Sequence, residues 1–275
     1  GAVQRTFNRY AGTPTARGKN VEKMKIFPRV VVFSGGLWYT VRMFGYYGAS
    51  DSLYLIALLA IMAASLAAQG AVQRTFNRYA GTPTARGMSA EQVAAALLAR
   101  GGSAARIEPV AGRLTDHFNP RTGTVGLSQA VYGSNSIAAV AVAAHEIGHV
   151  MQYEEHYAPI RFRNAILPAA NLGSTIAPYL VILGLIMSSF NLAMAGVVLF
   201  GAMLLFQVVT LPVELNASSR ALRMLEEGGY VTYEESDAAK RVLRAAAMTY
   251  VLAALASLVN FLRLLSLASR TRRND

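Results

Sequence analysis

The chain has 275 residues, of which 53% are hydrophobic and only 15% charged, a composition too apolar for an ordinary soluble domain and typical of a membrane protein. It has no cysteine, which excludes disulfides and thiolate metal sites, so histidines and carboxylates must hold any transition metal. The net charge of +11 comes from basic residues beside apolar tracts without a nucleic-acid-binding motif, so we expect a lipid bilayer and no nucleic acid as partner.

The chain begins with a duplicated segment. The 18 residues GAVQRTFNRYAGTPTARG stand at positions 1–18 and again, letter for letter, at 70–87. Copies of an ancient structural repeat would have diverged, and only the second copy continues naturally into the sequence that follows it. We therefore interpret residues 1–42 as an extension added by fusion or by the gene model. The natural chain is then expected to be residues 43–275, and a genuine short duplication is the alternative.

The first apolar tract, at about 50–68, is just long enough to span a bilayer. The polar region after it opens with a helix that starts at the capping box SAEQ, residues 89–92, and ends at the glycines 101–102. Short strands are expected within ARIEPVAG, residues 105–112, and TGTVGLS, residues 122–128. These elements predict a small α+β domain.

The segment VAVAAHEIGHVMQ, residues 140–152, carries a candidate zinc motif. His145 and His149 are four residues apart, so on a helix their imidazoles lie one above the other and can approach one ion. Glu146 falls on the adjoining face, where a general base must lie to accept a proton from activated water. The flanks are uncharged, as in a helix that is buried in a core. A chance occurrence is the alternative for the motif alone.

A long apolar tract follows the histidine pair. Residues 178–212 include no charge, which is too many residues for a single crossing, and the polar residues SSFN at 188–191 interrupt the tract. The tract therefore predicts a hairpin of two membrane helices, at about 173–189 and 192–211.

The remaining sequence predicts two more helices. One is expected from Pro212 to Glu227, and a second capping box, Thr232 with Glu235, opens the next. A fourth apolar segment at about 246–268 includes one charge, Arg263, so it either spans with a snorkelling arginine or is re-entrant.

Glu214 is the best candidate for a third ligand. It lies in LPVELNASSRAL directly after the third span, where a carboxylate near the bilayer needs a partner. The chain crosses the membrane twice between His149 and Glu214, so both residues lie on the same side of it. The alternative is a solvated glutamate in the first turn of a helix. His156 is one position out of register for a metzincin ligand and is expected at the surface, whereas His117 could contact substrate.

Three motifs together resemble a known family. HEIGHVMQ, LTDHFNPRTGTVGLS and LPVELNASSRAL, with one span before and a hairpin plus a span after, are similar to YugP-like membrane zinc metallopeptidases over nearly all of residues 43–275. More distantly, the chain resembles the HtpX and CAAX-prenyl protease group. There, an aspartate four positions after the glutamate orients a zinc histidine. This chain has Ser218 at that position, so such support could come from Asn216 or elsewhere.

The resemblance implies a mainly α membrane protein of about four transmembrane helices with a small α+β zincin-like domain, formed by residues 88–170 and 212–244. The expected activity is that of a gluzincin-like endopeptidase on peptide or membrane-protein substrates. His145, His149 and Glu214 would hold Zn²⁺, and Glu146 would act as general base. Independently of the resemblance, the strand TGTVGLS could pair with an extended substrate backbone.

Basic residues indicate the sidedness of the protein in the cell membrane. Nine arginines lie between the first two spans and five basic residues between 213 and 244, against three in the C-terminal tail. The positive-inside rule therefore favours a cytoplasmic catalytic region. The tail, Arg270, Arg272 and Arg273, fits this orientation only if the last apolar segment is re-entrant.

Other functions fit the sequence less well. An intramembrane protease would need a span at SIAAVAVAA, which is too short to cross. A transporter would need more polar groups in its spans. A non-catalytic zinc-binding scaffold or assembly factor is the main alternative, but a structural zinc site usually has four protein ligands, without a spare glutamate such as Glu146.

Overall fold

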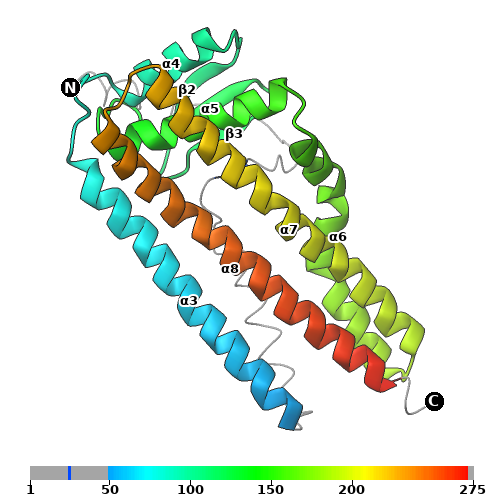
Figure 1. The fold of residues 1–275 in the computed structure, drawn as a ribbon. Coiled ribbons are helices and arrows are strands. Elements are labelled where there is room, and N and C mark those ends of the chain that lie inside the picture. Colours follow the sequence, from blue (N-terminus) through cyan, green and yellow to red (C-terminus); the bar gives the residue numbers. More distant parts are fainter. Residues whose placement is uncertain (1–23, 26–48, 272–275) are drawn as a thin grey trace. The chain divides into compact units, whose positions relative to one another are not determined.

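The computed structural model describes residues 24–25 and 49–271, which are mainly helical (Figure 1). The helices are α3 (Ala49–Ala80), α4 (Ala90–Arg100), α5 (Ile137–Glu154), α6 (Ala158–Ile186), α7 (Phe190–Glu227) and α8 (Tyr233–Thr271). The strands are β1 (Met24–Lys25), β2 (Arg106–Val110), β3 (His117–Asn119) and β4 (Thr124–Ser128). Apart from β1, the extension predicted at residues 1–42 lies outside the described residues.

The chain forms two compact units. The first, here called the sheet unit, comprises residues 24–25, 71–156 and 215–246 of the described chain. The second, the helical unit, comprises residues 49–70, 157–214 and 247–271. The long helices α3, α7 and α8 each contribute residues to both units.

The sheet unit contains a small sheet in the order β1-β3-β4-β2. β4 pairs parallel with β2 and antiparallel with β3, and the two residues of β1 pair antiparallel with β3. The expectation that residues 122–128 bind a substrate backbone is therefore wrong. The central strand β4 already has a partner strand on each side, and the outer strands of the sheet are the ones that can accept another segment.

Helix α5 forms the core of the sheet unit. Every residue from Ile137 to Gln152 is buried, and Ser136 caps the helix by accepting a hydrogen bond from the Ala139 N–H at 3.2 Å. Helix α4 and strands β3 and β4 pack against α5, with Val125 and Leu127 fully buried. The small alanines and glycine of α5 allow neighbours to approach from several directions. This helix is not among the candidate membrane spans, in agreement with the prediction of a buried helix outside the bilayer.

Four helices of the described chain are long and apolar enough to cross a membrane. They are Ser52–Ala80, Ala158–Ile186, Phe190–Glu227 and Tyr233–Arg270. The predicted hairpin is confirmed, since α6 ends at Ile186 and α7 begins at Phe190. Gly173, Gly184 and Gly196 bring the backbones of these two helices together, because a Cβ at each position would collide with the other helix.

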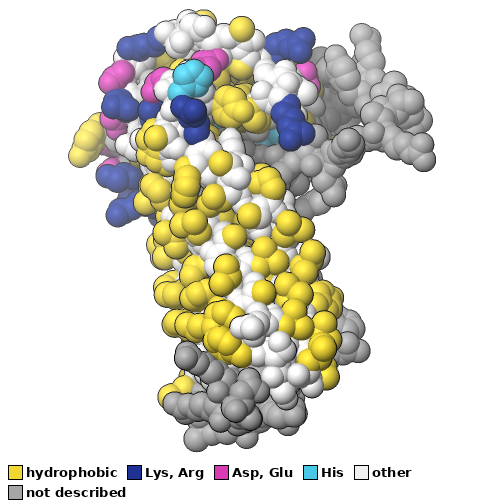
Figure 2. All heavy atoms as spheres, turned by 90° about the vertical axis from the view of Figure 1, so that its right-hand side faces the viewer, with side chains coloured by type: hydrophobic (Ala, Val, Ile, Leu, Met, Phe, Trp, Pro, Cys, Tyr) yellow, Lys and Arg dark blue, Asp and Glu magenta, His cyan; other side chains and the backbone are white. Residues whose placement is uncertain are grey.

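The surface of the helical unit suits a lipid environment. Large side chains such as Leu53, Ile186 and Val198 are each more than two-thirds exposed. In Figure 2, hydrophobic side chains cover the visible surface of the helical unit, whereas acidic and basic side chains gather over the sheet unit. A contiguous exposed apolar surface of this kind marks a membrane-embedded region.

One predicted helix boundary and one alternative for the last apolar segment do not agree with the structure. Pro212 lies inside α7 and does not begin a helix, because Val213, Ala217, Ala221 and Leu225 continue a fully buried stripe past it. Helix α8 is continuous from Tyr233 to Thr271, which does not fit a re-entrant segment. The capping box before it is confirmed: the Thr232 N–H donates to Glu235 Oε2 at 2.8 Å, and the Glu235 N–H donates to Thr232 Oγ1 at 3.3 Å.

Candidate metal centre

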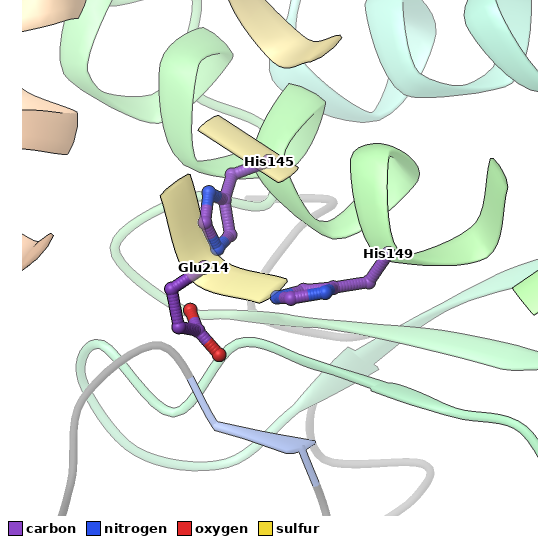
Figure 3. Close-up of side chains that lie close together, drawn as sticks. All are labelled: His145, His149 and Glu214. Carbon is purple, nitrogen blue, oxygen red and sulfur yellow. The ribbon is translucent and has the colours of Figure 1, made fainter. Parts of the chain in front are cut away.

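Three predicted side chains meet in one buried cluster. His145, His149 and Glu214 each offer one ligand atom, and these atoms all lie within 4.8 Å of one another. In Figure 3, the two imidazoles from α5 and the carboxylate from α7 point toward one another. The histidines are one helical turn apart, with ring centroids separated by 4.7 Å. The structure therefore brings together the set of side chains expected from the sequence.

A close approach of two helices places Glu214. A Cβ at Gly148 of α5 would lie only 2.6 Å from the backbone oxygen of Ala217 in α7, so only glycine fits this contact. Glu214 precedes Ala217 by three residues in the same helix and so lies on a neighbouring part of its surface. Glu214 is 3% exposed and lies in the middle of α7. The alternative of a solvated glutamate in a first helical turn is therefore wrong.

Glu146 follows the first histidine in α5 and is fully buried. It does not belong to the group of three possible ligands. Its carboxylate therefore lies in the same turn of α5 as the two candidate ligand histidines.

Each histidine of the cluster has a hydrogen-bond partner at Nδ1. His145 Nδ1 lies 3.1 Å from the Ser218 hydroxyl, and His149 Nδ1 lies 3.0 Å from Gln152 Oε1. Nε2, the nitrogen of each ring that does not take part in these two hydrogen bonds, is therefore the one that would bind a metal. Sequence reasoning named Ser218 but missed Gln152, although a residue three positions after His149 on the same helix was a detectable candidate.

Asn216 lies one step further from the cluster. Its Oδ1 accepts hydrogen bonds from Gln152 Nε2 at 2.9 Å and from Arg220 Nε at 2.8 Å. Arg220 also pairs with Glu155, with 2.7 Å between Nη1 and Oε2. Asn216 was named as a possible support of a zinc histidine, and the structure connects it to His149 through Gln152.

The two other histidines lie outside the cluster. His117 packs over Gly126, its neighbour across the β3–β4 pair, and its Nδ1 lies 3.0 Å from the Thr115 oxygen. The next residue, Phe118, projects from the opposite face of the sheet and contacts Tyr153 of α5. His117 therefore faces away from α5. His156 is exposed, as expected.

Asp116 is a buried carboxyl group that sequence reasoning missed. It accepts hydrogen bonds from the Ser128 N–H at 2.7 Å and from the Ser128 hydroxyl at 2.9 Å. Burial raises the pKa of Asp116 to about 6, although the two hydrogen bonds act in the opposite direction. The group ties the start of β3 to the end of β4.

The donor set fits zinc. Two imidazoles and one carboxylate are a common ligand combination for a catalytic zinc ion, which keeps a further position open for water. All three side chains are at least 97% buried, so they lie in a site that shields a metal from bulk solvent. The chemistry of these residues thus agrees with the expected Zn²⁺ cofactor.

Comparison with known proteins identifies the family. A family model described as "Putative neutral zinc metallopeptidase" matches residues 54–269. The "Putative membrane protease YugP" of Bacillus subtilis (strain 168) is 40% identical over 212 residues, which cover 77% of this chain and 94% of that protein. No solved structure matches the chain. With its four apolar helices and its buried His-His-Glu group, the chain is a membrane protein that belongs to this neutral zinc metallopeptidase family.

Proposed function

We propose that the protein is a membrane-bound zinc endopeptidase that cleaves peptide or membrane-protein substrates. The observation that carries this proposal is the buried cluster of His145, His149 and Glu214 with Glu146 in the same turn of α5. A zinc ion held for structural purposes usually has four protein ligands and no buried carboxylate in reserve. The arrangement therefore supports hydrolysis better than a non-catalytic scaffold.

These residues would have separate roles in metal binding and proton transfer. His145 and His149, through Nε2, and Glu214, through a carboxylate oxygen, would hold the ion. When bound, zinc supplies Lewis-acid activation of water and of the peptide carbonyl. Glu146 would accept a proton from the attacking water and deliver it to the leaving amine as the peptide bond breaks. Ser218 and Gln152 would hold the two imidazole rings in orientation.

The sheet supports recognition of an extended substrate at β3. Lys25 and Met24 of β1 pair antiparallel with His117 and Phe118 of β3. Because β1 lies in the segment interpreted as an extension, this edge of β3 would be open to an extended substrate in a chain that consists of residues 43–275. Phe118 contacts Tyr153, near the end of the helix that carries both histidines. A peptide bound along this edge would be held by its backbone, which gives weak side-chain preference.

The proposal is tested by replacing the base and a ligand separately. We expect Glu146→Gln to retain one zinc per chain and to lose at least about 100-fold in peptide cleavage, because the amide cannot accept the proton. Glu214→Ala should lose zinc as well as activity. The measurements are metal content and cleavage of a fluorogenic peptide library by the full chain in detergent.

The exposed carboxylate Glu234, in the first turn of α8, provides the control, since Glu234→Gln should change neither quantity. Undiminished cleavage by Glu146→Gln would contradict the assigned base. Full zinc binding without cleavage in the unchanged protein would favour the scaffold alternative.

A further inference from the structure

We infer that Gln152 is a positioning residue for His149, and that Arg220, acting through Asn216, determines which nitrogen of His149 carries the proton. The inference deepens the proposed zinc site and rests on it. It concerns four side chains that are connected end to end by hydrogen bonds: His149, Gln152, Asn216 and Arg220.

The direction of each hydrogen bond follows from the arginine. A guanidinium only donates, so Asn216 must present its oxygen to Arg220 Nε. The same Asn216 oxygen faces Gln152, which must therefore present its NH₂ group. Gln152 then has its oxygen toward His149, so Nδ1 of the imidazole must be the donor. A neutral imidazole with its proton on Nδ1 has a lone pair on Nε2, as a metal ligand requires.

Burial makes this order of donors and acceptors strict. Gln152 is fully buried and His149 is 1% exposed, so bulk water cannot supply the hydrogen bonds that a reversed amide would lose. Turning Asn216 over would bring its NH₂ group against the donor of Arg220, and turning Gln152 over would bring its oxygen against the oxygen of Asn216. The donor and acceptor roles in the three hydrogen bonds therefore depend on one another.

The two helices hold the network at both ends. His149 and Gln152 lie three residues apart on α5, and Glu155 is the residue that caps the C-terminal end of this helix. Asn216 and Arg220 are four residues apart on α7. The ion pair between Arg220 and Glu155 connects Arg220 to the C-terminal end of α5. Arg220 is thus fixed by a partner from the helix that carries both histidines.

The hydroxyl partner of the other histidine does not impose such a constraint. Ser218 contacts His145 through a hydroxyl, which can either donate or accept. Ser218 therefore supports the ring without choosing its proton position. We expect Ser218→Ala to weaken zinc binding less than Gln152→Ala does.

Zinc affinity is the first test. The dissociation constant is measured by chelator competition with the full chain in detergent. We expect Gln152→Ala to weaken binding by about 10- to 100-fold, the usual effect of losing a partner that orients a metal-bound histidine. Arg220→Met should weaken it less, since Gln152 remains present. Arg223→Met, an exposed arginine of the same helix, is the matched control and should have no effect. A Gln152→Ala affinity within twofold of the original would overturn the inference.

The proton position is the second test and needs no metal. The chain has four histidines, so ¹⁵N-histidine labelling gives a spectrum in which His149 can be assigned by comparison with His149→Gln. We expect His149 to carry its proton on Nδ1 in the metal-free original and in Arg223→Met, and to show a mixture of tautomers in Arg220→Met. An Nε2 proton in the original, or no change in Arg220→Met, would refute the inference.

These readouts separate this inference from the proposed function. A chain that binds zinc and cleaves no peptide would end the endopeptidase proposal, while both measurements on Gln152 and Arg220 would stand. If the original chain bound no zinc, the tautomer of His149 would still decide the inference. Circular dichroism of each variant controls for misfolding. If the Gln152 and Arg220 variants both weaken zinc binding, misfolding of one variant alone does not explain the loss.

Discussion

The carboxyl group of Asp116 makes the sheet unit sensitive to pH. Its pKa in the folded chain is about 6, against an ordinary value of 3.8, and burial is the main cause. Between these two values the folded chain retains a proton that the unfolded chain has released. The free energy of unfolding therefore falls as the pH rises through this window, by on the order of 3 kcal/mol at about 1.4 kcal/mol per pKa unit.

Asp116→Asn should remove this pH dependence. The amide oxygen can still accept from the Ser128 N–H, and the amide nitrogen can donate to the Ser128 hydroxyl, but nothing ionises. We expect the variant to gain stability relative to the original chain as the pH rises from 4 to 7. Thermal unfolding at several pH values measures the difference. Glu108→Gln, at an exposed position of β2, is the control, and parallel pH curves for Asp116→Asn and the original would refute the assignment.

The site could be predicted from sequence where its chemistry is local. His145, Glu146 and His149 occupy one helical turn, so their spacing alone indicates a common surface. The prediction of Glu214 as a ligand also depended on the two membrane crossings that bring the chain back to the side of the histidines. The proximity of Gln152 to His149 was detectable from their spacing, but the orientation of its amide could not be predicted, because that orientation depends on Asn216, which is 64 residues away in the sequence.

At the scale of elements, the contact between α5 and α7 determines the geometry of the cluster. Gly148 of α5 lies against the backbone of Ala217 in α7, and backbone atoms cannot give way as a flexible side chain can. Glu214, Asn216 and Ser218 all lie within three residues of Ala217. One glycine therefore positions a candidate ligand and the supports of both histidines.

Gly148→Ala should separate the two helices. The added Cβ would meet the Ala217 oxygen at 2.6 Å. We expect a net loss of stability, since overpacking costs about 1–3 kcal/mol and better helix propensity returns only about 1 kcal/mol. Zinc affinity should fall as well. Gly201→Ala in α7 is the matched control, because its nearest neighbour, Phe261 Cε2, lies at an ordinary 3.5 Å. Unaltered stability and zinc affinity in Gly148→Ala would contradict this account.

Capping signals predicted helix boundaries better than the proline did. The capping box at Thr232 and Glu235 identified the beginning of α8, because its hydrogen bonds are made within four residues. A proline suggested a break at residue 212, but the buried stripe of α7 continues across it. Packing against other elements outweighs the loss of one backbone hydrogen bond, and a single sequence does not reveal that packing.

At the scale of the whole molecule, sidedness is the property with the widest consequences for substrate choice. The count of basic residues favours a cytoplasmic catalytic region. The continuous α8 removes the re-entrant explanation for the arginines of the tail, so that tail is expected on the other side. The larger number of basic residues around the candidate metal centre is expected to decide the orientation.

The absence of cysteine allows a direct test of this orientation. We expect Ser188→Cys, at the exposed hairpin tip, to react with a membrane-impermeant maleimide in intact cells. Glu234→Cys, in the first turn of α8, should react only after permeabilisation. The unsubstituted chain is the control for background labelling. Reaction of Glu234→Cys in intact cells would place the catalytic region outside.

The candidate ligands are divided between two parts of the chain, and α6 with the first part of α7 lies between them in the sequence. A ribosome makes the two histidines first and the glutamate only after nearly the whole hairpin has been synthesised. A nascent or truncated chain that ends within the hairpin therefore has only two of the three ligands. The order of biosynthesis thus delays completion of the candidate metal centre until most of the apolar hairpin has been made.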